Sequence, residues 1–306
     1  AADVVISIGH QSRAEDEAMA QAVPGIDLIL GTHSHLKVPL TQIEGTATYY
    51  ISPFQYLGYV SHVTLHVAGG ELTEVTGELV AIDETTPEDA LLTAKVTEMQ
   101  DALEEEHPER FEILGEAATL IDNTDINLGE TGIGNFVTDL ARQAVDAHLF
   151  LSTSSSFRAA LPPGPITRED YLTALPYANT IVTATMQGSQ LLDLVALSAS
   201  KRGSDAFSQM SGVRYTLTVS DSTVSDVQVI SDPADPTSDY VALDPDATYT
   251  VATTNFQALI AADYKERFAE ATDLVNTEIN INDLVVDYIQ NNSPISATVD
   301  GRVQVY

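Results

Sequence analysis

The chain has 306 residues, of which 44% are hydrophobic, and this is enough to build more than one buried core. It carries 45 acidic residues against 13 basic ones, a formal net charge of −32. Such a surface repels nucleic acid backbones and anionic membranes, so we exclude both as general partners. The chain contains no cysteine, which excludes disulfides and thiolate chemistry. No apolar run approaches the roughly 18 residues of a membrane span.

The sequence opens on an apolar run, AADVVISIGH, which predicts a buried strand already under way at residue 3. The run lacks the basic start and the long apolar middle of a signal peptide. Because a chain seldom begins inside a core strand, we expect this sequence to be the later part of a longer protein. The acidity and the absence of cysteine favour an extracellular, periplasmic or cell-surface location.

Two short apolar runs flank a polar stretch with helical spacing near the start of the chain. The predicted strands are DVVISIGH and PGIDLILGTHSH, and the predicted helix is AEDEAMAQAV. Strand, helix and strand within some thirty residues indicate a βαβ unit with parallel strands. His10 and His33 then follow the carboxyl ends of neighbouring strands, where open α/β sheets bind ligands. The alternative is that both are polar loop residues at the surface.

The next segments alternate polar and apolar residues, which predicts antiparallel strands in ATYYISPF, YVSHVTLHV and ELTEVTGELVAI. His62 and His66 alternate with apolar residues there and are expected to face solvent. Residues 87–106 have the spacing of an amphipathic helix, and we place a domain boundary around them. The apolar face of this helix is formed by Leu91, Leu92, Val96, Met99 and Leu103.

From about residue 112 onwards the chain alternates strands and helices without a detectable repeat, which predicts an α+β or mixed α/β domain. The predicted helices are NFVTDLARQAVDA, REDYLTALP, GSQLLDLVALSAS and INDLVVDYIQNN. The predicted strands are AHLFLST, GVRYTLTVS, STVSDVQVI and TYTVATTNF. His107 is expected at the surface, and His148, which precedes a buried strand, is expected to pack rather than to act.

Sequence blocks along the whole chain resemble the 5′-nucleotidase family, which includes UDP-sugar hydrolases and 2′,3′-cyclic phosphodiesterases. PGIDLILGTHSH and QYLGYVSHVTL resemble the second half of the family's metallophosphoesterase domain. The blocks that resemble its C-terminal domain, in the same order, are ETGIGNFVTDLAR, GPITREDYLTALPYANTIVTATMQGSQLLDLV, SDAFSQMSGVRYTL, YTVATTNF and DYIQNNSPI. The resemblance implies an α/β (α+β) fold. Residues 1–85 would be the second half of a metallophosphoesterase αββα sandwich, 86–110 a linker helix, and 111–306 a mixed α/β substrate-binding domain.

The resemblance also implies a site for two divalent metal ions, zinc, manganese or similar. His10 and His33 match metal ligands, and His35 matches a position that is a ligand or a close neighbour. The family's Asp-x-His, a further Asp and its Asn-His pair complete both metals and supply the catalytic histidine, and they are absent from this sequence. We therefore expect no catalytic residue in this chain, incomplete metal ligation, and no activity without the missing N-terminal half of the metal domain.

A nucleotide or nucleoside pocket is implied in the C-terminal domain. Tyr177 and Phe256 match the two aromatic residues that clamp the base, and Asn179 matches the asparagine beside the first. A base between two aromatic faces gains about 1–3 kcal/mol, whichever base it is. Arg158 matches an arginine that binds the phosphate or ribose of the substrate. Gly212 matches a backbone contact near the base, and Asp263 matches a carboxylate that binds the ribose. The alternative for the two aromatic residues is core packing.

Three departures from the family pattern thin the expected phosphate-binding charges. The glycine-rich NGGGIR loop is replaced by TSSSFR, so Ser154, Ser155 and Ser156 bring side chains whose hydroxyls can bind ligand oxygens. Two arginines expected before ETGIGN are missing from DNTDINLGE, and GGDGY appears as IAADY with its aspartate shifted by one position. No histidine and aspartate spacing supports a serine nucleophile in this loop.

Two functions from different classes follow. The first is a secreted, metal-dependent nucleotide phosphohydrolase of 5′-nucleotidase type, of which this chain is the later part. The second is a catalytically degenerate relative that serves as an extracellular binding or surface-scaffold protein. A related specificity, such as cyclic nucleotides or UDP-sugars, is a third possibility for the same site.

Overall fold

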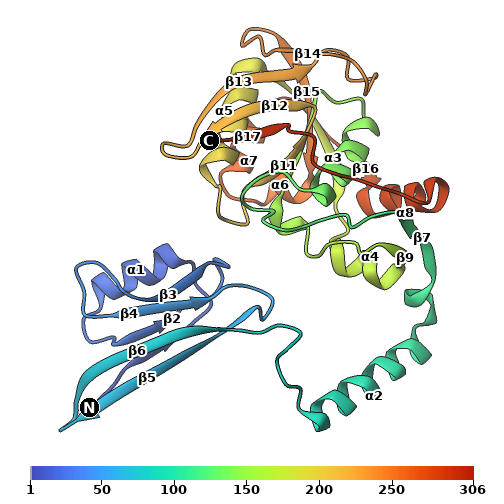
Figure 1. The fold of residues 1–306 in the computed structure, drawn as a ribbon. Helices are drawn as coiled ribbons and strands as arrows, with labels where there is room; N and C mark the ends of the chain where they lie inside the picture. The colour runs from blue at the N-terminus through green and yellow to red at the C-terminus, as the bar shows by residue number, and fades with distance from the viewer. Residues whose placement is uncertain (1) are drawn as a thin grey trace. The chain divides into compact units, whose positions relative to one another are not determined.

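The computed structural model describes residues 2–306 and shows two compact units (Figure 1). The first unit extends to Thr97 and the second runs from Glu98 to Tyr306. The boundary between them lies inside helix α2 (Ala90–Glu106), which the amphipathic spacing predicts. The finer division into residues 1–85, 86–110 and 111–306 stays a prediction.

The first unit is built on a four-stranded sheet with the strand order β1-β2-β4-β3. Its elements are β1 (Ile6–Ile8), α1 (Arg13–Ala22), β2 (Leu28–Leu30), β3 (Lys37–Gln42), β4 (Tyr49–Pro53), β5 (Tyr59–Ala68) and β6 (Glu71–Ala81). The predicted βαβ unit is confirmed, because β1 pairs in parallel with β2. Helix α1 covers one face of the sheet, where Ala20, Ile29 and Tyr50 share a small core (Figure 1).

Helix α1 begins where the sequence supplies a complete capping box. The Ser12 hydroxyl accepts from the backbone N–H of Glu15, and the Glu15 carboxylate accepts from the backbone N–H of Ser12. Two N–H groups that the first turn leaves without helical partners are thereby satisfied. The start of α1 is therefore fixed shortly after His10.

Two predictions for the first unit are wrong in part. The opening run predicts a buried strand from residue 3, but β1 begins at Ile6, and Ile8 is 77% exposed. Within residues 2–306, strand β1 is the edge of the sheet and pairs with β2 alone, so little covers its side chains. The alternating pattern predicts antiparallel pairing for β4, which holds for β3, but β4 is parallel to β2. Strand β3 is not predicted from the sequence, because Pro39 is unfavourable within a strand.

The β5–β6 hairpin and helix α2 have the predicted secondary structure. The hairpin is antiparallel, and its His62 and His66 side chains are exposed, which confirms that they face solvent. Helix α2 buries none of its residues, and Leu91 and Met99 on its apolar face are largely exposed. Its spacing thus identifies the helix correctly, while nothing among the described residues covers that face.

The second unit contains most of the secondary structure of the chain. Its helices are α3 (Gly132–Gln143), α4 (Arg168–Ala174), α5 (Gly188–Ser200), α6 (Asn255–Leu259), α7 (Tyr264–Ala269) and α8 (Ile281–Asn292), with 3₁₀ turns η1 (Pro108–Phe111) and η2 (Ser154–Ser156). Its strands are β7 (Ile113–Ala117), β8 (Leu149–Thr153), β9 (Gly164–Thr167), β10 (Thr180–Gln187), β11 (Ser208–Ser211), β12 (Val213–Thr218), β13 (Thr223–Ile230), β14 (Tyr240–Ala242), β15 (Thr248–Thr254), β16 (Thr272–Asn280) and β17 (Val303–Val305).

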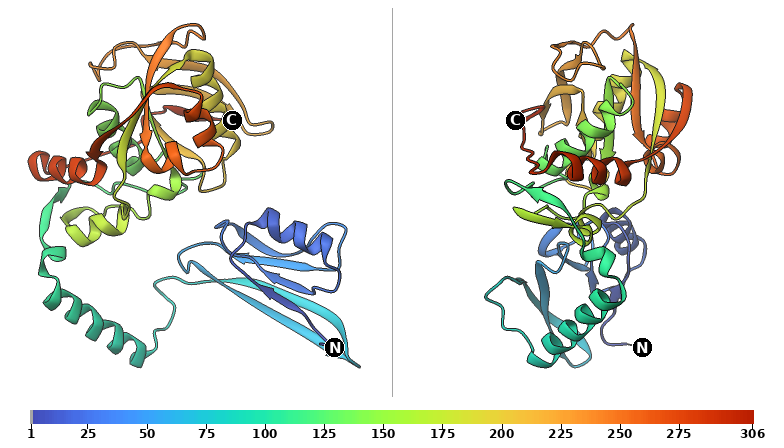
Figure 2. Two further views of the ribbon diagram at one scale, coloured as in Figure 1. Left: turned by 180° about the vertical axis from the view of Figure 1, so that it is seen from behind. Right: turned by 90° about the vertical axis from the view of Figure 1, so that its right-hand side faces the viewer.

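A five-stranded sheet, β11-β8-β15-β10-β16, forms the centre of the second unit and is buried on both faces. Alternate residues of β8 show this, because Phe150 belongs to one hydrophobic core and Leu149 and Leu151 belong to the other. Helices α3, α4 and α8 pack on the Phe150 side, and α5, α7 and the second sheet, β14-β13-β12-β17, pack on the opposite side (Figures 1 and 2).

The mixed α/β class predicted for this region is confirmed, as are all four predicted helices and all four predicted strands. Short or edge elements such as β14, β16 and α6 are not predicted from the sequence, because their pattern of apolar residues is weak. None of the helices among residues 2–306 has both the length and the apolar character needed to cross a bilayer.

His148 packs as predicted, and its surroundings make the stability of the protein depend on pH. Its Nδ1 accepts from the backbone N–H of Thr250 at 3.1 Å, and its ring meets Tyr249 edge-on. Burial, reinforced by the Arg142 guanidinium, lowers the pKa of His148 below its usual value. Protonation is therefore easier in the unfolded chain, and this stabilising contribution is full above about pH 6.5 and is lost as the pH falls towards the folded pKa.

We expect urea unfolding of the chain to show a loss of stability as the pH falls below about 6.5, and His148→Gln to reduce that loss. The glutamine amide keeps an acceptor for Thr250 but does not titrate. Subtracting the unfolding free energy of the variant from that of wild type removes the contributions of the carboxylates and of the other histidines, because both proteins contain them. A difference that stays constant across this pH range would contradict the assignment.

Candidate functional site

A pocket of about 230 Å³ in the second unit brings together five residues from separate parts of the sequence. It is lined by Ser155, Ser156, Tyr177, Asn179 and Phe256. Each of these five is a residue that sequence analysis names as substrate-binding. The predicted candidates therefore meet in space, although up to about a hundred residues separate them along the chain.

The central sheet explains why these residues meet. The turn η2 follows β8, and Phe256 lies on α6, which follows β15. Because β8 and β15 are parallel neighbours, both turns lie at the same edge of the sheet. Strand β10 runs antiparallel to β15, so the loop that precedes it, with Tyr177 and Asn179, reaches that edge as well.

The two aromatic residues of the pocket are exposed. Tyr177 is 49% exposed and Phe256 is 38% exposed, whereas Phe150, Phe157 and Tyr171 are fully buried. Their side chains are therefore not part of the core, and the core-packing alternative does not describe them. Two half-exposed rings beside a pocket offer flat faces on which a planar ring can stack.

The three serines of η2 have different roles. The Ser154 hydroxyl lies within hydrogen-bond distance of the carbonyl oxygens of Ile126 and Phe207, so it fastens the turn to the protein rather than lining the pocket. Ser155 is within 2.9 Å of the Thr153 hydroxyl, and Ser156 accepts from the Ser152 hydroxyl at 3.0 Å. Of the three serines, only Ser155 and Ser156 line the pocket.

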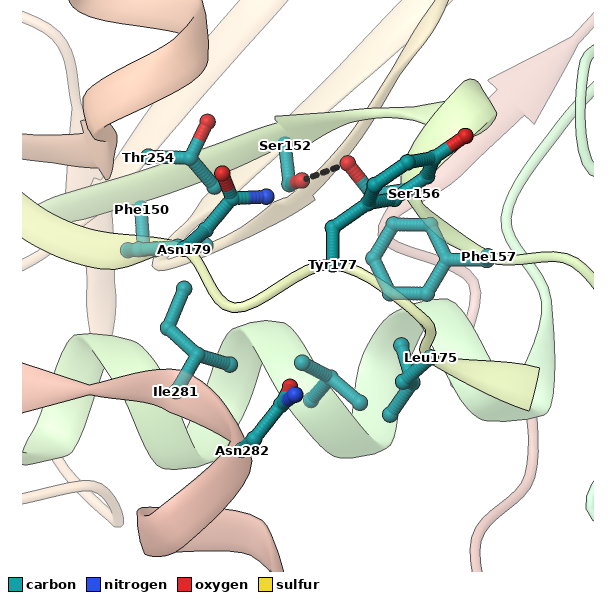
Figure 3. A pocket seen from close by; sticks show the side chains of 11 residues that line it. Phe150, Ser152, Ser156, Phe157, Leu175, Tyr177, Asn179, Thr254, Ile281 and Asn282 are labelled. Atoms are coloured by element: carbon teal, nitrogen blue, oxygen red, sulfur yellow. Dashed lines mark hydrogen bonds between the residues drawn. The ribbon is translucent and has the colours of Figure 1, made fainter. Parts of the chain in front are cut away.

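A smaller cavity of about 20 Å³, the inner cavity, adjoins the pocket and shares Ser156, Tyr177 and Asn179 with it. Figure 3 shows the side chains that line this cavity. The other side chains that line it are Val137, Phe150, Ser152, Phe157, Leu175, Thr254, Ile281 and Asn282. The apolar members of this set belong to the hydrophobic core, and their sequence pattern is that of ordinary core residues. The sequence therefore carries no signal that distinguishes them as lining a site.

No charged side chain lines either the pocket or the inner cavity among the residues that the structure describes. Arg158 lies close by, with its Nη1 donating to the Ser155 carbonyl at 3.4 Å and its backbone N–H donating to Ala174. The lining thus combines aromatic faces, hydroxyls and one amide. The chemistry of such a set suits an uncharged ring that carries hydrogen-bonding atoms.

His10 and His33 come together in the first unit as their strand positions predict. The Nδ1 atom of His33 lies 3.1 Å from the Nε2 atom of His10, and the rings meet edge-on. The two loops are tied together, because the Thr32 hydroxyl donates to the carbonyl of Gly9 at 2.6 Å. His33 and His35 both adopt positive φ, 34° and 50°, in the turn after β2, a backbone conformation that is uncommon for residues other than glycine.

The family model described as 5′-nucleotidase, C-terminal domain, matches residues 113–266, half of the chain. The chain belongs to the 5′-nucleotidase family. It is 29% identical over 269 residues to the trifunctional nucleotide phosphoesterase YfkN of Bacillus subtilis, covering 82% of this chain and 18% of that protein. It is 24% identical to the 5′-nucleotidase of Vibrio cholerae, covering 96% of this chain and 59% of that protein.

Solved structures confirm the fold. The 5′-nucleotidase precursor of Thermus thermophilus superposes with a TM-score of 0.78 at 23% identity, over 99% of this chain and 64% of that one. The sulfate thiohydrolase SoxB of the same organism superposes with a TM-score of 0.73 at 19% identity, over 99% and 54%. The chain thus spans about a fifth to about three fifths of the length of the curated relatives named here.

5′-Nucleotidases are generally dependent on divalent metals, so the fit of the two histidines to a metal can be tested. Two imidazole nitrogens that bind one tetrahedral zinc, each at about 2.0–2.1 Å, are roughly 3.3 Å apart. The 3.1 Å between the nitrogens of His10 and His33 is close to this value. Within residues 2–306, however, no group of three or more metal-binding side chains lies together. The two nitrogens are also within hydrogen-bond distance of each other, so the pair could supply at most two ligands and does not form a metal site by itself.

His35, Gly212 and Asp263 lie outside the pocket and the histidine pair. The His35 ring is half-buried beside Tyr56, with 6.1 Å between ring centres. Gly212 has φ of 86°, and a side chain there would collide with the His148 carbonyl, so the close packing of the backbone requires glycine. Asp263 accepts from the Lys201 ammonium, which holds the pKa of this carboxyl below its usual value.

Proposed function

We propose that this chain is the substrate-binding part, with one wall of the metal site, of a 5′-nucleotidase-type phosphohydrolase that acts on nucleotide phosphoesters. The observation that supports it best is the pocket in the second unit, where two half-exposed aromatic side chains, Tyr177 and Phe256, stand with Asn179 and the serine turn. The names of the relatives, nucleotidases and phosphoesterases, favour the same class of substrate.

In this proposal the pocket holds the nucleoside and orients the nucleotide. Tyr177 and Phe256 stack on the base, Asn179 and the serine hydroxyls bond to its edge or to the sugar, and Arg158 contributes positive charge near the turn. His10 and His33 each supply a neutral imidazole nitrogen to bound divalent ions. Such ions polarise a phosphate and lower the pKa of a bound water.

The remaining metal ligands and the catalytic histidine would come from a further part of the metal domain, which the chain meets as its partner. We propose two divalent ions, since two ions can neutralise both the attacking and the leaving oxygen. The acidic surface and the lack of cysteine favour an extracellular or periplasmic location for the whole protein.

The test compares the full-length protein with the 306-residue chain. We expect the full-length protein to release phosphate from AMP when Mn²⁺ or Zn²⁺ is added, and the shorter chain to release none. Calorimetry of the shorter chain with adenosine and AMP reports binding independently of catalysis. The panel of substrates includes cyclic nucleotides and UDP-sugars. If the full-length protein releases phosphate from none of them, the proposed enzymatic function is contradicted.

A second candidate function is a degenerate relative that binds or serves as a surface scaffold. The uncharged lining of the pocket and the Lys201–Asp263 ion pair favour it, since both reduce the groups available to a nucleotide phosphate or ribose. Binding of neither adenosine nor AMP, with the pocket folded as described, would support the scaffold over the enzyme.

A further inference from the structure

We propose that Ser156 is a specificity-determining residue, whose hydroxyl donates a hydrogen bond to an acceptor atom on the inner edge of the ring clamped by Tyr177 and Phe256. This inference rests on the proposed function, because it takes the pocket to be a nucleoside site. It adds which atom of the protein reads the ring and which kinds of ring the pocket rejects.

The position of Ser156 in the turn supports this proposal. Ser156 lines both the pocket and the inner cavity, so its side chain stands where the two adjoin. It is 9% exposed. The turn that holds it is fixed by the Ser154 hydroxyl, which lies within hydrogen-bond distance of the Ile126 and Phe207 carbonyls, and by the backbone N–H groups of Ser154 and Ser155. A ring entering between the two aromatic residues therefore meets a hydroxyl whose place is set before binding.

The hydrogen bonds around Ser156 determine which kind of ligand atom its hydroxyl can bind. The Ser152 hydroxyl donates to the Ser156 oxygen at 3.0 Å, so the Ser156 oxygen is already an acceptor in that bond. Its own proton remains available for a ligand, because a hydroxyl has one donor and two acceptor positions. The matching group on the ligand is consequently an acceptor, such as a ring nitrogen or a carbonyl oxygen.

The inner cavity beside Ser156 limits the size of the group that a bound ring can place there. Its volume of about 20 Å³ is room for one water molecule, or for a group of similar size on the ring, and its walls include Phe150, Phe157 and Leu175. These side chains are fully or almost fully buried, so the space cannot widen cheaply. Rings with a bulky inner substituent are therefore excluded, and charged rings are disfavoured because no charged side chain of the described lining is present to pair with them.

The test is calorimetry of the 306-residue chain with adenosine, guanosine, uridine and cytidine, followed by analogues of the best ligand in which one acceptor at a time is replaced by C–H. For wild type we expect one analogue to bind about 2- to 10-fold more weakly, the loss of one hydrogen bond. Ser156→Ala is expected to bind the parent nucleoside more weakly by the same factor and to bind that analogue as wild type does. This coupling identifies the bonded atom.

Two further variants complete the experiment. Ser156→Gly widens the boundary, and we expect it to gain affinity for nucleosides with a larger inner substituent. Ser225→Ala, an exposed serine on β13 outside the pocket, is the control and is expected to bind as wild type does.

The outcomes separate the two proposals. If wild type binds no nucleoside, the proposed function fails and this inference fails with it. If wild type binds a nucleoside but Ser156→Ala binds it equally well, the inference is overturned and the proposed function stands. If Ser156→Ala does not fold, the wild-type analogue series decides, because equal affinity for every analogue excludes a donated hydrogen bond.

Discussion

Replacing His33 with alanine in the full-length protein is expected to lower phosphate release from AMP by at least about 100-fold. Residues that merely orient a metal ligand cost about 10- to 100-fold when mutated, so a residue that binds the metal directly costs at least as much. The 3.1 Å approach of the His33 and His10 nitrogens predicts that His10→Ala has an effect of the same size. Steady-state phosphate release measures both.

Metal content distinguishes loss of a ligand from general damage. We expect His33→Ala and His10→Ala to retain less divalent metal than wild type after dialysis, measured by elemental analysis, and to unfold at the same temperature as metal-free wild type. His62→Ala is the matched control, since it removes an exposed histidine of the same unit whose ring faces Glu78. Wild-type activity in His33→Ala would remove both histidines from the proposed metal site.

The second large effect is expected at the aromatic residues of the pocket. Stacking of a base on one aromatic side chain contributes about 1–3 kcal/mol, so Tyr177→Ala and Phe256→Ala should each weaken nucleoside binding by about 5- to 150-fold. Both side chains are half-exposed, so their removal leaves little cavity in the core and the fold should survive. Calorimetry with the 306-residue chain measures the effect, and thermal unfolding checks the fold.

The double variant shows whether the two rings act on one ligand. Residues that clamp the same ring are coupled, so the combined loss is expected to differ from the sum of the single losses. Leu259→Ala is the control, because Leu259 is an exposed apolar residue of the same short helix as Phe256 and lines no part of this pocket. Unchanged binding in both single variants would contradict the clamp.

The candidate site shows how far sequence analysis reaches and where it stops. The juxtaposition of His10 and His33 follows from a local βαβ pattern, because parallel strands joined by a helix place their carboxyl ends side by side. The meeting of Tyr177 with Phe256 depends on the pairing of β10 with β15, which joins segments far apart in the chain. Only the family resemblance, and not any local pattern, predicts that meeting.

Side-chain direction within η2 is beyond the reach of the sequence. Three consecutive serines are chemically identical, yet Ser154 bonds to carbonyls of the core while Ser155 and Ser156 line the pocket. The direction of each hydroxyl depends on the residues packed against the turn, such as Phe207 and Ile126. The sequence predicts hydroxyls in this loop but not which of them a ligand meets.

Periodicity, capping residues and turn residues determined the types of the main elements, and the βαβ pattern determined the place of the two histidines, because these depend on neighbours within a few turns of chain. The tertiary structure alone decided the exposure of β1, the parallel pairing of β4 with β2, and the inner cavity beside Ser156. Each of these results from contacts between residues distant in sequence. Such contacts depend on how whole elements pack, which a local pattern does not specify.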